Sequence, residues 1–130
     1  MNSATTRAIR KCLNFDSTDM AGLGEVSTVT ANRWERVEWK AHPNSIVSRE
    51  LVRLVQAQDV FTQEILNKFK SDDIAKAELK FFISDEVFKN DMPEMAEAGY
   101  SMNFMNGVQI NVLRQAVANQ LPLELEFNYC

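Results

Sequence analysis

The chain has 130 residues, of which 45% are hydrophobic and 25% charged, a composition typical of a soluble globular domain. Its formal net charge is −4 at pH 7, and it has no dense block of Lys and Arg to neutralise a nucleic-acid backbone. No apolar run approaches the length of a membrane span. We therefore expect a single domain over residues 1–130 that binds neither nucleic acid nor a membrane.

The charge is unevenly distributed along the chain. Residues 1–40 hold six Lys and Arg against five Asp and Glu, whereas residues 81–130 hold two against seven. The acidic C-terminal part would attract a basic partner, although an acidic face that only maintains solubility has the same composition. We expect Cys12 and Cys130 to be unpaired thiols of a cytoplasmic protein, because the N-terminus lacks the apolar segment of a secretion signal.

The first forty residues are predicted to combine a helix, a loop and strands. A narrow apolar face predicts a helix over 3–14, with Ser3 as its cap. Residues 15–25 contain turn formers and two of the four glycines, which predicts a loop. The β-branched and aromatic residues that follow predict a strand at 33–41 and a possible preceding strand at 26–30.

The clearest element is a long helix over residues 44–70. Pro43 precedes it, and Asn44 or Ser45 offers a capping oxygen. Its apolar residues recur at spacings of three, four or seven, which places them on one stripe. These residues are Val47, Leu51, Leu54, Phe61, Ile65 and Phe69.

Alternating apolar residues predict two further strands in the second half of the chain. One covers 77–83, and the other covers 121–129, where Leu, Leu and Phe alternate with Glu, Glu and Asn. The polar segment between them is predicted to hold short helical turns at 85–88 and 95–99.

The segment after Gly99 supports two interpretations. Asn106-Gly107 between alternating apolar runs is typical of a hairpin turn, while the apolar spacing after Gly107 also fits a helix. We predict a strand at 100–105 and a helix at about 109–119. The combined prediction is an α+β fold, with a mainly antiparallel sheet of four to five strands. The helix at 44–70 would pack across one face of that sheet, together with one or two shorter helices.

No catalytic or metal-binding constellation is evident. His42 is the only histidine, and a small ligand-binding domain or enzyme that uses it with Glu38 or Asp85 is one alternative function. Neither Cys12 nor Cys130 has a local motif that would activate its thiol, and the two cysteines with one histidine lack the spacing of a zinc site. We assign no catalytic residue, no metal ligand and no cofactor.

The leading hypothesis is a non-enzymatic protein–protein interaction module, such as an adaptor, inhibitor or assembly factor. Met102 and Met105 belong to a Met-rich interval that suits a partner surface but also suits core filling. Trp34 lies on the opposite strand parity from Trp39, so we expect Trp34 to be an exposed anchor and Trp39 to lie in the core. The acidic candidates for binding a protein partner, which we expect to be basic, are Glu94, Glu97, Glu124 and Glu126.

Two further hypotheses concern the same surface. The four glutamates could mimic a nucleic acid and block the basic groove of a nucleic-acid-binding protein. An exposed sheet face or edge strand could instead form a homodimer.

Overall fold

The computed structural model describes all residues from 1 to 130 and is mainly helical, with seven α-helices, one short 3-10 helix and a single two-stranded sheet. The prediction of an α+β fold with a four- to five-stranded antiparallel sheet is therefore wrong. Two of the predicted strands exist, and they pair in parallel. The remaining predicted strands are helical or irregular.

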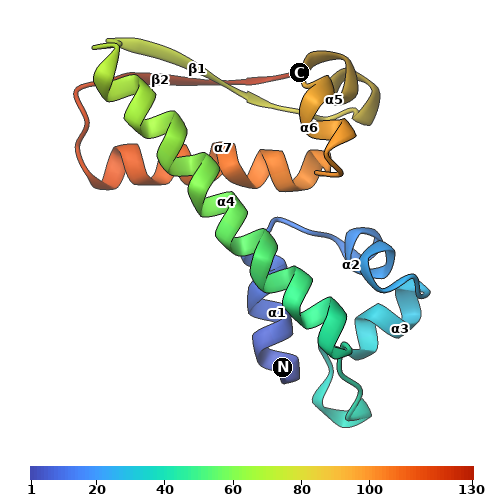
Figure 1. Cartoon of the computed structure of the whole chain (residues 1–130). Helices are drawn as coiled ribbons and strands as arrows, with labels where there is room; N and C mark the ends of the chain where they lie inside the picture. The colour runs from blue at the N-terminus through green and yellow to red at the C-terminus, as the bar shows by residue number, and fades with distance from the viewer. The chain divides into compact units, whose positions relative to one another are not determined.

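The chain divides into two compact units, an N-terminal unit Met1–Ala57 and a C-terminal unit Gln58–Cys130. The helix α4 (Ser45–Ser71) begins in the first unit and ends in the second (Figure 1). The expectation that residues 1–130 form one domain stays a prediction.

The N-terminal unit contains only helices. These are α1 (Ser3–Cys12), α2 (Ser17–Gly24), α3 (Thr28–Arg33), the 3-10 helix η1 (Val37–Trp39) and the first part of α4. The helix predicted at 3–14 is confirmed, but its cap is Asn2, whose Oδ1 accepts the Thr5 N–H at 2.8 Å.

The loop predicted at 15–25 and the strands predicted at 26–30 and 33–41 are wrong. Asp16 caps α2 in a reciprocal capping box with Asp19, which supplies a strong local start signal. In the next stretch Ala31 and Trp34 are buried three residues apart, while Val29 and Val37 are exposed. Helical spacing of the buried residues thus outweighs the strand preference of the valines, which face outward.

The long helix predicted over 44–70 is confirmed as α4. Asn44 is the cap, since its Oδ1 accepts the Val47 N–H at 2.9 Å. Val47, Leu51 and Leu54 of the predicted apolar stripe are buried, and so is Leu66, next to the stripe residue Ile65. The periodic apolar pattern is therefore sufficient to locate this helix.

In the C-terminal unit, β1 (Lys76–Phe81) lies beside β2 (Glu124–Tyr129) in a parallel pair, with Lys76 opposite Glu124 and Phe81 opposite Tyr129 (Figure 1). Both strands were predicted, with slightly different bounds. Parallel strands need a long crossover connection. Here the connection contains α5 (Asp85–Asp91), α6 (Pro93–Glu97) and α7 (Met102–Ala118).

One face of the β1–β2 pair packs against α7 and the end of α4. Leu79 of β1, Leu66 of α4 and Val112 of α7 form a buried cluster, with Phe127 of β2 partly buried against it. Lys76, Glu78 and Glu126 lie on the opposite face, which is exposed. The sheet thus has one apolar and one charged side.

The strand predicted at 100–105 is wrong, and so is a hairpin turn at Asn106-Gly107. The helix α7 begins at Met102, with the Ser101 hydroxyl accepting the Phe104 N–H at 3.1 Å, and the helix predicted at about 109–119 is its second half. Asn106 is 1% exposed and lies inside α7. Tertiary contacts of Asn106 thus override the local turn signal.

Candidate functional site

In the N-terminal unit, α2 and α3 are joined by a turn of three residues, 25–27. Glu25 adopts the left-handed conformation with φ 52°, and the Val26 N–H donates to the Ala21 carbonyl at 3.1 Å. Ser27 then caps α3 by accepting the Thr30 N–H at 3.2 Å. The end of one helix and the start of the next are therefore both specified by local hydrogen bonds.

A close contact between Gly24 and Trp34 fixes the packing of these two helices. A Cβ atom added to Gly24 would lie 2.7 Å from Cη2 of Trp34, closer than a real Cβ contact allows. The Trp34 ring is therefore seated directly on the backbone at the end of α2. Two helices joined by a three-residue turn and packed against each other share the turn length of a helix-turn-helix motif.

The outward face of α3 carries polar and small apolar side chains. Thr28, Val29, Asn32 and Arg33 are exposed, whereas Ala31 is buried. The Asn32 Oδ1 accepts a hydrogen bond from the Ser17 hydroxyl of α2 at 2.6 Å. The guanidinium of Arg33 lies 4.3 Å from the ring centroid of Trp39, in a cation–π contact. Two side chains of this face are therefore held in place by neighbouring residues.

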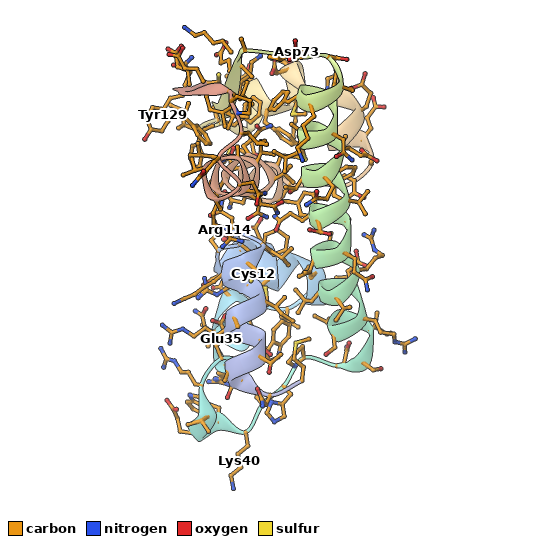
Figure 2. The ribbon with its side chains drawn as sticks, turned by 90° about the vertical axis from the view of Figure 1, so that its left-hand side faces the viewer. Cys12, Glu35, Lys40, Asp73, Arg114 and Tyr129 are labelled. Carbon is orange, nitrogen blue, oxygen red and sulfur yellow. The ribbon has the colours of Figure 1, made fainter.

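Beside this face is a polar hollow of about 400 Å³. Its lining comprises Arg7, Arg10, Asp16, Ser17, Asn32, Glu35 and Arg36. Arg10 forms an ion pair with Glu35, and its Nε lies 2.9 Å from each of the two carboxylate oxygens. Figure 2 shows Glu35 against α1. Arg7 and Arg36 are exposed and make neither an ion pair nor a hydrogen bond through their side chains. The hollow thus has two unpaired guanidinium groups available for an anion.

The two units differ in charge. The N-terminal unit holds eight Lys and Arg against six Asp and Glu, or +2, and the C-terminal unit holds six against twelve, or −6. The acidic character of the whole chain therefore resides in the C-terminal unit. In the N-terminal unit Lys40 also points away from the ribbon (Figure 2).

The residues predicted to bind a partner are only partly at the surface. Trp34 is 5% exposed and Trp39 is 50% exposed, so the predicted exposure of the two indoles is reversed. Met105 is 2% exposed and Met102 is partly buried. Trp34 and Trp39 do not follow strand parity, because this segment is helical.

The four predicted glutamates are all exposed but lie on different elements. Glu94 and Glu97 are on α6, while Glu124 and Glu126 are on β2. Glu126 is 3.7 Å from the Lys76 ammonium, so part of its charge is neutralised within the sheet. Figure 1 shows α6 near the end of β2, away from the start of this strand. The four carboxylates therefore do not form one cluster.

His42 and Glu38 of the enzyme hypothesis are both exposed, and their side chains have no polar contact with each other or with another residue. Cys12 and Cys130 are free thiols, as predicted. None of the helices combines the length and hydrophobicity needed to cross a membrane.

A second hollow lies in the C-terminal unit and is apolar. It has a volume of about 270 Å³ and is lined by Phe81, Ile110, Phe127, Asn128 and Tyr129. The Phe81 ring centroid is 5.9 Å from those of both Phe127 and Tyr129. Tyr129 is 79% exposed and points outward in Figure 2, so an aromatic surface faces solvent here.

The helix pair in the N-terminal unit was not predicted, although the sequence carries signals for it. Asp16 and Asp19 have the spacing of a capping box, and Ser27 precedes two buried apolar residues, Ala31 and Trp34, that are three positions apart. No protein-family model matches the chain, and no curated protein matches its sequence.

Proposed function

We propose that the N-terminal unit binds double-stranded DNA, with α3 entering the major groove. The observation that carries this proposal is the tightly packed pair α2–α3, whose second helix presents an exposed polar face. Helix-turn-helix proteins use the second helix of such a pair to contact base edges.

The side chains on this face have suitable chemistry for reading DNA. An Asn amide makes paired hydrogen bonds with adenine, and an Arg guanidinium makes them with guanine. Asn32 and Arg33 supply these groups, and the methyl groups of Thr28 and Val29 suit contact with thymine. Arg7 and Arg36, the unpaired guanidinium groups of the polar hollow, would contact backbone phosphates.

This proposal departs from the expectation that the chain binds no nucleic acid. That expectation used the charge of the whole chain. The N-terminal unit alone carries +2, and its unpaired Arg side chains lie beside α3. Local positive charge at the interface, more than the total charge of the chain, determines contact with phosphates.

Selection from a random duplex library, followed by anisotropy titration of the full chain, tests the proposal. We expect an enriched sequence that binds more tightly than its scrambled version. Arg33→Ala should reduce that preference by about fivefold to 150-fold, because one base contact is worth about 1–3 kcal/mol. Arg114→Ala, an exposed Arg on α7, is the matched control and should bind as the wild type does. Failure to enrich any sequence, or equal effects of both variants, would contradict the proposal.

A protein partner for the C-terminal unit is a second candidate function. Its support is the charge of −6 on this unit together with the aromatic hollow around Tyr129. A basic protein with an apolar side chain at its centre would fit both features. Cross-linking in native cells should then recover a stoichiometric basic protein with the wild type but not with Tyr129→Ala. Val117→Ala, another exposed apolar position, is the control.

A further inference from the structure

The strand β1 has an outer edge with no partner strand. Hydrogen bonds toward β2 involve the Ala75 and Phe81 carbonyls and the Ile83 N–H. Backbone groups of successive strand residues point to alternate sides, so the N–H and C=O groups of Lys76, Glu78 and Lys80 point away from β2. The sheet has only two strands, and this edge is therefore free.

The free edge is limited at one end by the side chain of Asn106. Phe82 is the next residue whose backbone groups point outward, and Asn106 binds both of them, at 2.9 Å and 2.8 Å. An added strand could therefore pair only with the segment from Lys76 to Lys80. This segment is short, and Lys76 and Glu78 within it are exposed.

The side chains along this edge alternate in charge and all lie on the exposed face of the sheet. Consider a second copy that pairs antiparallel, so that its segment 76–80 overlaps this segment completely. Lys76 would then face the partner's Lys80, and Glu78 would face the partner's Glu78. Like charges directly opposite each other are destabilising. If the register is shifted by two residues, Lys76 of each copy lies opposite Glu78 of the other copy. Two such pairs form, one on each side of the two-fold axis.

The alternative shift would place Lys80 opposite the partner's Glu78, but Lys80 already has a partner. Its ammonium donates to the Asp91 carboxylate of α5 at 3.0 Å and 3.3 Å. The contact of Lys76 with Glu126 is longer, at 3.7 Å, and leaves Lys76 more available. In the register that pairs Lys76 with Glu78, the two-fold axis passes between the two copies of Ala77. The small side chain of Ala77 permits close approach of the two strands.

The outer edge of β2 cannot pair with its own copy through opposite charges. On the exposed face β2 carries Glu124, Glu126 and Asn128. In antiparallel pairing of β2 with its own copy, Glu126 would face a glutamate, or Asn128 in the register centred on Phe127, so no register offers an opposite charge. Charge therefore favours β1 over β2 as the edge that pairs with itself.

We propose that two copies of this chain associate through antiparallel pairing of their β1 edges, with Lys76 of each copy opposite Glu78 of the other. The contact is closed by a two-fold axis, so it ends at the dimer. It goes beyond the proposed DNA binding and does not depend on it, because it involves only the C-terminal unit. Two copies would also supply two N-terminal units for two half-sites.

Analytical ultracentrifugation of the full chain without DNA tests the proposal. We expect the wild type to sediment at twice the chain mass in a concentration-dependent manner. Glu78→Lys should weaken the dimer at least about tenfold, because two attractive pairs become repulsive ones. This variant should keep its fold, since residue 78 lies opposite Glu126 and the new Lys would face a carboxylate. Glu64→Lys has the same charge change at an exposed site on α4 and should leave the dimer intact.

The charge-swapped variant Lys76→Glu/Glu78→Lys should restore the dimer, because both opposite-charge pairs of the proposed register form again with their signs exchanged. Backbone amides of Lys76 and Glu78 should exchange slowly in the wild type and quickly in Glu78→Lys. A monomeric wild type, growth beyond the dimer through β1–β2 pairing, or no effect of Glu78→Lys would overturn the proposal.

Discussion

The Asn106 side chain holds the backbone of Phe82 as a neighbouring strand would. Its Oδ1 accepts the Phe82 N–H at 2.9 Å, and its Nδ2 donates to the Phe82 carbonyl at 2.8 Å. Both residues are 1% exposed, so no water replaces these bonds if they are lost. One amide in α7 thus satisfies two buried backbone groups that follow β1.

Replacing Asn106 with Leu should therefore be strongly destabilising. The change leaves a buried N–H and a buried C=O without partners, at a cost of about 1–3 kcal/mol each. Urea unfolding should give a free energy of unfolding lower by about 2–6 kcal/mol. Asn67→Leu, at an exposed position of α4, is the control and should change it little. A loss below about 0.5 kcal/mol for Asn106→Leu would contradict this role of the amide.

Gly24 and Gly22 of α2 form a matched pair for testing the contact with Trp34. Gly24→Ala should destabilise the unit by about 1–3 kcal/mol, because the new Cβ would lie 2.7 Å from the Trp34 ring. Gly22→Ala meets nothing within 4 Å and should stabilise the helix by up to about 1 kcal/mol. Thermal unfolding measures both. Equal effects of the two substitutions would show that Trp34 moves aside freely.

Arg7 and Arg36 should contribute to DNA affinity without affecting sequence preference. If each contacts a phosphate, Arg7→Ala and Arg36→Ala should weaken binding to specific and scrambled duplexes by the same factor. Each should also reduce the slope of log affinity against log salt by about 1. Anisotropy titrations from about 50 to 200 mM salt measure this slope. A change in sequence preference would instead assign these residues to base contacts.

The Glu50–Arg53 pair should make stability depend on pH in the acid range. The hydrogen bond that the Arg53 Nε donates, at 2.8 Å, lowers the pKa of Glu50 below its ordinary value of 4.5. The ionised Glu50 therefore stabilises the folded state above pH 4.5. This stabilisation is lost as the pH falls through the lower pKa that Glu50 has in the folded state.

The comparison with Glu50→Gln isolates this contribution. The difference in free energy of unfolding between wild type and variant should be constant near neutral pH and should shrink below about pH 4.5. It should be small, because both side chains are more than one third exposed. A difference that grows on acidification would contradict the assignment.

The parts of the fold that could be predicted are those in which local pattern and burial agree. The α4 stripe is apolar at helical spacing, and β2 alternates at strand spacing, so both were found. Asn106-Gly107 failed because its hairpin signal is local, while Asn106 is fixed by Phe82, 24 residues away. Pattern analysis cannot anticipate a buried polar contact at that separation.

The candidate site was missed for a related reason. The valines at 26, 29 and 37 suggested strands, yet Val29 and Val37 lie at the surface and contribute little to the choice of structure. The residues that determine the helix pair are Ser27 as a cap and Gly24 as the seat of Trp34. Capping signals were available from the sequence, whereas the seat of Trp34 required the packed helices.

The parallel pairing of β1 with β2 has a consequence for the order of folding. Lys76 pairs with Glu124, and all residues that face each other in this sheet are 48 positions apart in the chain. Closing so long a connection costs entropy before any contact repays it, and nonlocal pairing slows folding. The helices of the N-terminal unit form through much shorter separations. We expect refolding in two kinetic phases, a fast one for the N-terminal unit and a slow one in which β2 reaches β1.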